Sequence, residues 1–256
     1  MDQNIIVLVI AHNEGKNIEK CLDSLVNQTL KPSKIIVVVH NSKDQTYHIA
    51  HKFAQLHPET CIKIIPYICA PEGVVYARLK ALQYIEDEEY VLCIDGDSFA
   101  QTNWAGKMLT NVYIIPYMLP DILVGSYVKF KGPFFFCLFL NIINKMLTSI
   151  YKKNPIDYIW GPSFGFPPRD KKEIVKCLRK SIELKEKLQL GNIPEDYILA
   201  KYMVKIKKGR IRVINSTFVT THTKEKTFQQ MLNRLRNNLS TKFKIDEYVK
   251  KEKNST

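Results

Sequence analysis

Apolar and polar positions along the first hundred residues follow a pattern that predicts strands and helices in turn. Continuous apolar runs, which are typical of buried strands, occupy residues 5–10, 35–39 and 91–94, and residues 62–65 are expected to form a further strand. Segments with apolar residues at helical spacing separate these runs and occupy residues 18–25, 46–56 and 74–85. Strand and helix units of this length imply a parallel sheet that helices cover through right-handed crossovers. The pattern therefore predicts an α/β fold with its binding site in the loops at the carboxyl edge of the sheet.

Two carboxylates around a glycine follow the apolar run that ends at Ile94. Asp95, Gly96 and Asp97 would lie at the carboxyl edge of the sheet, where both acidic side chains can face a ligand. Mg²⁺ and Mn²⁺ prefer oxygen ligands and leave coordination positions for phosphate, so the triplet suits a metal that bridges the protein to a diphosphate. An isolated Asp-x-Asp is also typical of an ordinary turn after a strand.

Polar residues also follow the first two predicted strands. The first loop carries AHNE at residues 11–14, and the second carries HNSKDQT at residues 40–46. Neither loop contains the Gly-x-Gly-x-x-Gly of a dinucleotide-binding fold or the Gly-Lys-Ser/Thr of a Walker loop. A nucleotide at this edge would therefore be bound in another geometry. Asp44 is equally well placed to cap the helix that begins near Thr46.

Four segments together resemble the inverting family 2 glycosyltransferases. They are VIAHNE at residues 9–14, VVHNSKDQT at 38–46, EGVVYAR at 72–78 and IDGD at 94–97. In the same order, they are similar to that family's opening strand and Asn-Glu loop, its Asp-Asp-Gly-Ser-x-Asp-x-Thr element, its Gly-x-x-x-Ala-Arg segment and its metal motif. The resemblance implies a single domain of GT-A fold, with a Rossmann-like, mostly parallel mixed sheet flanked by helices.

The resemblance also implies a division of the chain into parts. Residues 1–222 would form the glycosyltransferase domain, with the nucleotide bound by residues 1–100 and the acceptor by residues 101–222. Residues 223–256 would form a basic amphipathic extension. The segment GPSFG at residues 161–165 resembles a glycine-bearing segment that precedes the acceptor side in the family, although a plain turn explains it equally well.

A candidate general base lies in GNIPED at residues 191–196, which looks like the family's Glu-Asp motif. The resemblance implies that Asp196 deprotonates the acceptor hydroxyl, with Glu195 beside it as a second catalytic candidate. From the residues alone, both acids could belong to the first turn of a helix after Pro194, where the helix dipole stabilises negative charge. The two interpretations are compatible. A single displacement assisted by this base would invert the anomeric centre without a covalent intermediate.

The resemblance implies a divalent metal, Mn²⁺ or Mg²⁺, and a nucleotide-diphosphate sugar as donor. The metal ligands would be Asp97, Asp95 and His222, and the metal would stabilise negative charge on the departing phosphate. His222, expected in a loop after a strand over residues 210–214, could equally be structural, and Arg78 could be a surface residue of its helix. The residues assigned to donor binding are Ala11, His12, Glu14, His40, Asn41, Arg78, Asp95 and Gly96.

Two departures from the family pattern limit what the resemblance implies. Val39 and His40 stand where the family usually has an acidic residue that recognises the nucleobase, so UDP, GDP and dTDP are all candidate nucleotides. The Gln-x-x-Arg-Trp element of processive polymerases is not intact in QMLNRLR at residues 230–236. This difference favours a single transfer to each acceptor. Arg234 and Arg236 could still clamp phosphate, or they could form a basic helix face.

The composition is that of a globular protein with a strongly basic balance. The chain has 256 residues and a formal net charge of +13, which indicates an anionic partner such as nucleic acid, a membrane surface or an anionic substrate. Basic residues crowd the last third, but no nucleic-acid-binding signature accompanies them. We therefore expect a nucleotide sugar and a glycan or lipid-linked acceptor as partners, an anionic membrane surface as a candidate partner, and no nucleic acid.

Cysteine usage and the start of the chain bear on location. The six cysteines include no Cys-x-x-Cys pair and lie mostly in apolar surroundings, which predicts buried free thiols in a reducing compartment. No basic-then-apolar leader precedes the first predicted strand. The expected location is the cytoplasm, either free or at the cytoplasmic face of a membrane.

The most apolar stretch of the chain is FFFCLFLNII at residues 134–143. Asn141, Asn144 and Lys145 interrupt it before the roughly 20 residues that a membrane span needs. It could pack as a core helix beside the acceptor cleft, or it could lie in a membrane interface with nearby lysines toward the headgroups. Burial is the expectation that we favour.

The sequence as a whole predicts a metal-dependent, inverting and nonprocessive glycosyltransferase that moves one sugar from a nucleotide-diphosphate sugar to a glycan or glycolipid. The nearest alternative is transfer to a polyprenyl phosphate. An alternative from another class is a noncatalytic protein of the same fold that binds a membrane or a carbohydrate. Asp97 and Asp196 argue against the noncatalytic alternative, and the altered nucleobase loop argues mildly for it.

Overall fold

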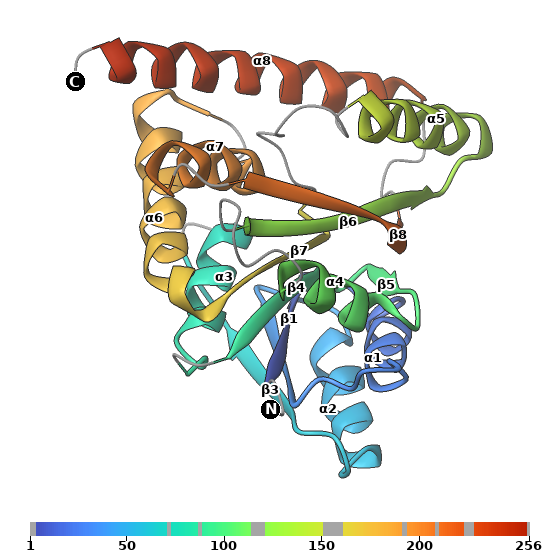
Figure 1. Ribbon diagram of the computed structural model, residues 1–256. Helices are drawn as coiled ribbons and strands as arrows, with labels where there is room; N and C mark the ends of the chain where they lie inside the picture. The colour runs from blue at the N-terminus through green and yellow to red at the C-terminus, as the bar shows by residue number, and fades with distance from the viewer. Residues whose placement is uncertain are drawn as a thin grey trace.

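The structure is a computed structural model that describes residues 4–70, 73–86, 89–113, 121–150, 161–190, 194–207, 210–222 and 228–254. Its centre is an eight-stranded sheet with the strand order β3-β2-β1-β4-β7-β6-β8-β5. Helices cover both faces of this sheet, as Figure 1 shows. The predicted α/β class, with a mostly parallel mixed sheet in one domain, is confirmed.

The first half of the chain forms the elements that the apolar pattern predicts. Its strands are β1 (Ile5–Ala11), β2 (Lys34–His40), β3 (Ile62–Tyr67) and β4 (Tyr90–Asp95), and all three strand pairs among them are parallel. Its helices are α1 (Ile18–Val26), α2 (Thr46–Leu56) and α3 (Val74–Leu82). The strands run slightly beyond the apolar runs because pairing continues to polar ends, as between His40 and Tyr67.

The second half adds the mixed part of the sheet. Its strands are β5 (Ser98–Ala100), β6 (Asp121–Lys131), β7 (Ser163–Phe166) and β8 (Arg210–His222). Its helices are α4 (Trp104–Tyr113), α5 (Phe134–Ile150), α6 (Lys171–Lys187), α7 (Glu195–Lys207) and α8 (Phe228–Asn254), with a 3₁₀ turn over Pro168–Asp170. Strand β7 is antiparallel to both β4 and β6, and it joins the two halves of the sheet.

Strand β8 is longer than the sequence predicts. It continues past Ile214 to His222, pairs in parallel with β6 and pairs antiparallel with β5. Its register against β6 shifts where Ser126 pairs with Ile214 and Tyr127 with Phe218. The polar residues at 215–217 conceal this continuation from an apolar pattern. The loop placement of His222 was wrong, because His222 is the last residue of a strand.

Strand β1 anchors cores on both faces of the sheet. Ile6 and Leu8 belong to one core, which buried residues of α3, α6 and α7 complete. Val7 and Val9 belong to the other core, which α1, α2 and α4 complete. Burial of this much apolar surface is the main stabilising contribution of the fold, at roughly 25 cal/mol per Å². It also fixes the positions of the carboxyl ends of β1, β2 and β4 relative to one another.

Helix α5 turns polar side chains toward the sheet and large apolar side chains outward. Asn141 accepts a hydrogen bond from the backbone N–H of Phe130 at 2.8 Å and donates to the carbonyl of Phe130 at 3.0 Å. Asn144 donates to the carbonyl of Val128 at 2.6 Å. The expected burial of this stretch was wrong for most of the large side chains whose exposure the structure describes. Those exposed are Phe134, Leu138, Phe139, Ile142 and Met146.

Helix α8 runs along one end of the molecule, above α7 in Figure 1. Ile245 of α8 is buried in the core that α7 completes, and the Tyr197 hydroxyl donates to Asp246 at 2.6 Å. None of the described helices is long and apolar enough to cross a membrane. The cysteines are free thiols, and four of them are buried, while Cys61 is exposed and Cys69 is half-buried.

Candidate active site

A cleft of about 340 Å³ opens at the carboxyl ends of β1, β2 and β4. This is the edge of the sheet at which the sequence predicts a ligand site. The residues that line the cleft are Ile10, His12, Glu14, His40, Gly73, Val74, Asp95, Gly96 and Asp97. Of the predicted donor-binding residues, the cleft therefore brings together His12, Glu14, His40, Asp95 and Gly96.

Gly96 shapes the turn that carries the two carboxylates. Its backbone N–H donates to the carbonyl of Ile10 at 2.8 Å, and a Cβ at this position would lie 2.9 Å from the Cβ of Ala11. Only glycine allows so close an approach between β1 and the turn after β4. Ala11 is fully buried and packs against this turn, so its part in the site is to seat Gly96.

Asp97 is held by two hydroxyl groups from neighbouring strand residues. Its Oδ1 accepts hydrogen bonds from Ser98 at 2.9 Å and from Thr221 at 3.2 Å. Its carbonyl accepts from the backbone N–H of His222 at 3.2 Å. Strand β8 thus brings His222 beside the acidic turn, as the metal prediction requires.

The donor set at this turn fits a hard divalent cation. Burial, followed by the charge of Lys131, lowers the pKa of His222, which favours the neutral imidazole that a metal needs. Within the described ranges, no three His, Cys, Asp or Glu side chains form a preformed metal cluster. One or two carboxylates completed by substrate phosphates are the usual arrangement for Mg²⁺. Asp95 and Asp97 therefore fit a metal that arrives with a diphosphate.

Two histidines and a glutamate form the wall of the cleft opposite the acidic turn. The rings of His12 and His40 stack with their centroids 5.0 Å apart, and His12 Nδ1 donates to the carbonyl of His40 at 2.9 Å. Glu14 is buried, and its carboxylate accepts a hydrogen bond from Asn17 at 2.9 Å. This wall offers aromatic surface and one carboxylate to a ligand.

Asn41 and Asp44 hold the loop that follows β2. Asn41 has a positive φ of 47°, and its side-chain amide exchanges two hydrogen bonds with the backbone of Cys69, each 2.9 Å long. Asp44 accepts from the backbone N–H of Thr46, the first residue of α2, at 3.0 Å and from that of Gly15 at 2.9 Å. The helix-start role that the sequence suggests for Asp44 is present, and Asn41 lies outside the lining of the cleft.

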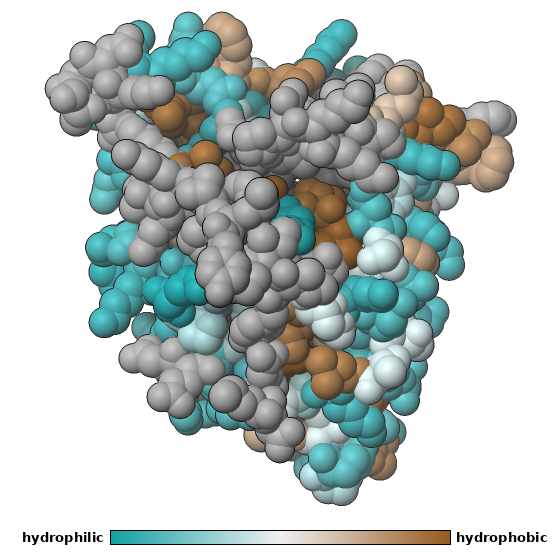
Figure 2. All heavy atoms as spheres, viewed as in Figure 1, coloured by the Kyte–Doolittle hydropathy of each residue, from teal (hydrophilic) through white to brown (hydrophobic). Residues whose placement is uncertain are grey.

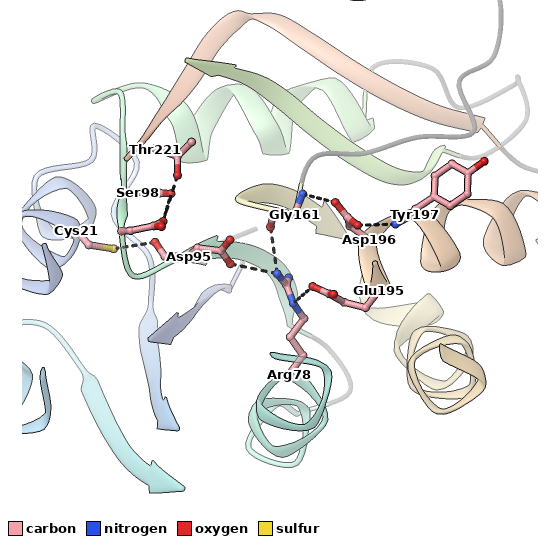
Figure 3. A network of polar contacts seen from close by, with 10 residues as sticks. Cys21, Arg78, Asp95, Ser98, Gly161, Glu195, Asp196, Tyr197 and Thr221 are labelled. Carbon is pink, nitrogen blue, oxygen red and sulfur yellow. Dashed lines mark hydrogen bonds and ion pairs between the residues drawn. The ribbon is translucent and has the colours of Figure 1, made fainter. Parts of the chain in front are cut away.

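Arg78 is buried between the cleft and the start of α7. Its Nη2 donates to Asp95 at 3.1 Å and to the carbonyl of Gly161 at 3.2 Å, and its Nε lies 3.4 Å from Glu195 Oε1. Its guanidinium also lies over the ring of Phe164, 4.9 Å from the centroid. Figure 3 shows Arg78 reaching from α3 to all three polar partners. The alternative of a surface helix residue is therefore wrong.

Glu195 and Asp196 occupy the first turn of α7 in different environments. Burial raises the pKa of Glu195 to about 8, although the charge of Arg78 acts to lower it. Asp196 is half-buried, and its Oδ2 accepts a hydrogen bond from the backbone N–H of Gly161 at 3.0 Å. Its Oδ1 accepts from the N–H of Tyr197 at 2.8 Å. Asp196 is thus the more accessible carboxylate, whereas Glu195 faces Arg78.

Gly161 and Thr221 contact the site residues, although the sequence placed Gly161 only in a segment before the acceptor side and gave Thr221 no role. Gly161 accepts from Arg78 through its carbonyl and donates to Asp196 through its N–H, so it links the two side chains. A Cβ at residue 161 would lie 3.3 Å from the Asp196 carboxylate. The segment GPSFG signalled a turn, but a backbone contact of this kind leaves no pattern in side-chain types. Thr221 lies in the part of β8 that the apolar pattern misses.

The family model described as glycosyl transferase family 2 matches residues 6–166 of the chain, which is more than half of its 256 residues. This chain belongs to glycosyl transferase family 2. A curated relative, the glycosyltransferase GlyA of Streptococcus pneumoniae serotype 4, is 29% identical over 139 residues. That match covers 53% of this chain and 19% of GlyA, so the chain spans about a fifth of the length of this relative.

Solved structures of other glycosyltransferases share the fold. The mannosyltransferase PcManGT from Pyrobaculum calidifontis, solved with GDP-Man and Mn²⁺, aligns with a TM-score of 0.63 and 17% identity over 96% of this chain and 64% of its own. Glucosyl-3-phosphoglycerate synthase from Mycobacterium tuberculosis, solved with Mn²⁺, UDP and phosphoglyceric acid, aligns with a TM-score of 0.58 and 14% identity. The alignment covers 94% of this chain and 79% of the synthase. These likenesses confirm the GT-A fold.

The polar groups of this family 2 chain form two connected sites. The acidic turn after β4 offers oxygen ligands at the cleft, and Asp196 offers an accessible carboxylate at the start of α7. Arg78 and Gly161 connect the two sites through direct contacts. A metal-bound anion on one side and a hydroxyl on the other are the ligands that such an arrangement can hold.

Proposed function

We propose that this family 2 chain is a metal-dependent, inverting glycosyltransferase that moves a single sugar from a nucleotide-diphosphate sugar to a glycan or glycolipid acceptor. The observation that carries the proposal is the contact chain from Asp95 through Arg78 and Gly161 to Asp196. These contacts fix the position of Asp95, on the proposed donor side, relative to Asp196, on the proposed acceptor side. Neighbours of the same fold solved with GDP-Man and Mn²⁺, or with UDP and Mn²⁺, support this donor class.

On the donor side, Asp97 and Asp95 would hold Mn²⁺ or Mg²⁺, with His222 as the third protein ligand. A metal bound there supplies charge stabilisation for the departing diphosphate. Ser98 and Thr221 orient the Asp97 carboxylate through their hydroxyl groups. His12 and His40 would contact the nucleoside, and because residue 40 is not acidic, UDP, GDP and dTDP are all candidates for its nucleotide.

On the acceptor side, Asp196 would take the proton of the attacking hydroxyl. Hydrogen bonds from Gly161 and Tyr197 hold its carboxylate in place, and general bases of this kind contribute typically about a hundredfold to ten-thousandfold to rate. Direct attack on the face opposite the leaving diphosphate inverts the anomeric centre. Glu195 would act through Arg78, as a residue that positions the site.

The exposed apolar face of α5 favours a lipid-linked acceptor. Transfer to a polyprenyl phosphate is the second candidate function, and this face is the observation that supports it. A cytoplasmic location in contact with a membrane belongs to the same proposal. One transfer per acceptor is proposed because residues 230–236 lack the processive Gln-x-x-Arg-Trp element.

Two substitutions separate the proposed roles. Asp196→Asn should lower the transfer rate by about a hundredfold or more while donor binding stays near that of the unsubstituted protein, because only the base is lost. Asp97→Asn should weaken metal-dependent donor binding. Transfer is measured as release of nucleoside diphosphate with a panel of nucleotide sugars and glycan or polyprenyl phosphate acceptors, and donor binding by calorimetry.

The matched control is Asp23→Asn, an exposed aspartate of α1 outside the cleft, which should leave both quantities unchanged. Full transfer by Asp196→Asn would show that another group is the base. Release of a product with retained anomeric configuration, observed by NMR, would contradict a single displacement.

A further inference from the structure

Helix α5 presents an ordered row of apolar side chains to solvent. Phe134, Leu138, Ile142 and Met146 recur every fourth residue, so they lie on one side of the helix. Their exposed fractions are 72%, 47%, 51% and 59%, and Phe139 beside them is 53% exposed. Figure 2 shows apolar side chains at the upper right, where Figure 1 places α5. Contiguous exposed apolar surface of this kind marks a binding face.

The contacts of α5 prevent this row from turning inward. Asn144, on the side of the helix opposite the row, hydrogen-bonds the backbone of Val128 in β6, and Asn141, at the margin of the row, hydrogen-bonds the backbone of Phe130. Rotation of the helix would leave those polar groups without their bonds and bring large side chains against a sheet edge. The outward direction of the apolar row is therefore a built feature of the fold.

Helix α8 also exposes apolar and basic side chains. Leu239 and Phe243, one turn apart, are 67% and 66% exposed. Arg236 and Lys250 lie seven residues before and after Phe243, so they share its side of the helix, and both are exposed. Exposed basic side chains flank this stripe, and Glu247 is an acidic neighbour. The flanking residues are Lys244 and Lys251.

We propose that the outward faces of α5 and α8, together called the docking face, bind an anionic lipid bilayer. The apolar side chains would enter the boundary between headgroups and acyl chains, and the basic side chains would meet the headgroups. Charge complementarity favours this occupant, because the chain carries a net charge of +13 and α5 contains no acidic residue. Neither helix needs to cross the membrane for this contact.

The inner side of α8, opposite the docking face, contacts the residue that follows the proposed base. Tyr197, which follows Asp196 in α7, donates to Asp246 of α8, and the ammonium of Lys242 in α8 lies 5.1 Å from the centre of its ring. A bilayer against α8 would therefore lie near the side of the molecule where the acceptor hydroxyl must approach Asp196. The delivery of a lipid-linked acceptor rests on the proposed function, whereas bilayer binding itself does not.

The test is sedimentation of the full chain with vesicles that contain roughly 30 mol % anionic lipid, compared with neutral vesicles. The unsubstituted protein should bind the anionic vesicles and lose binding at high salt. Ile142→Gln with Met146→Gln on α5, and Lys244→Glu with Lys251→Glu on α8, should each weaken binding about tenfold or more. The matched control is Leu56→Gln with Lys52→Glu on α2. Both residues are exposed, and Figure 1 shows α2 at the opposite end of the molecule from α5 and α8.

All variants are checked for unchanged melting temperature and for nucleotide binding without vesicles. No binding of the unsubstituted protein to anionic vesicles, or equal loss in the α2 control, would overturn the docking face. A dimer of the unsubstituted protein that the α5 substitutions dissociate would assign the face to a second copy of this chain instead. If the unsubstituted protein binds nucleotide but no vesicles, the docking face is overturned and the proposed function stands. If it binds vesicles but no nucleotide, only the proposed function is overturned.

Discussion

Arg78 is one buried cation that faces the carboxyl groups of two elements. Asp95 ends β4 at the acidic turn, and Glu195 begins α7, the helix that carries the proposed base. Burial raises the pKa of Glu195 to about 8 despite the opposing charge of Arg78, which favours the protonated form of this carboxyl group. Arg78 thus joins the turn after β4 to the start of α7, which are the proposed donor and acceptor sides.

The pKa of Glu195 predicts how stability depends on pH. A glutamate in the unfolded chain has a pKa of about 4.3, whereas burial raises the pKa of Glu195 in the folded protein to about 8. The folded state therefore holds one more proton between these values, and the free energy of unfolding should fall as pH rises through this window, by up to about 1.4 kcal/mol per pH unit. Glu195→Gln should remove this slope, which urea unfolding across the window measures.

Glu183→Gln is the control for that series, because Glu183 is an exposed residue of α6 in an ion pair with Lys180. It should keep the slope of the unsubstituted protein. An equal slope in Glu195→Gln and the unsubstituted protein would show that Glu195 is ionised in the folded state.

At the scale of elements, α5 shows how polar residues can direct a helix. Asn141 and Asn144 interrupt an apolar stretch, and in the sequence they read only as breaks in a membrane span. In the structure they are the residues that bond β6, so the apolar side chains point away from the protein. Apolar content alone favours burial of such a helix. The hydrogen bonds of the two asparagines to β6 instead orient it with large apolar side chains exposed.

Asn141→Leu tests this account of α5. The substitution removes two hydrogen bonds to the backbone of Phe130 and leaves those groups in a half-buried site. We expect a loss of about 1–3 kcal/mol in the free energy of unfolding, measured by urea denaturation. Ile142→Gln, on the outward side of the same helix, should change it by less than about 0.5 kcal/mol. Equal effects of the two substitutions would contradict the assigned orientation.

At the scale of the whole molecule, the two halves of the chain differ in how well the sequence predicts them. Strands β1 to β4 pair in parallel, and β1, β2 and β4 are buried on both sides, so apolar runs and helical spacing predict this half directly. Strand β8 carries polar residues at a register shift, and its last residues form a strand only because β6 and β5 lie beside them. The local pattern of apolar and polar residues does not predict long-range pairing of this kind.

The candidate site likewise has a part that the sequence predicts and a part that it does not. The acidic turn, His12, His40 and Glu14 follow predicted strands, and they do line one cleft. The link from Arg78 to Asp196 passes through the backbone of Gly161, 83 residues after Arg78, so the sequence shows its members but not their contact. Ala11 and Asn41 illustrate the converse, because residues that match a motif can serve to shape the site through packing or backbone bonds.

The most direct test of the central claim is a thermal-shift titration of the full chain with UDP, GDP and dTDP, each with and without Mn²⁺ or Mg²⁺. A ligand that binds only the native state raises its stability by about 2.7 kcal/mol at a hundred times its Kd. We predict that one nucleotide raises Tm by several degrees only when metal is present, that Asp97→Asn loses this shift, and that Asp196→Asn keeps it. A shift that needs no metal and survives Asp97→Asn, or no shift with any nucleotide, would contradict the account.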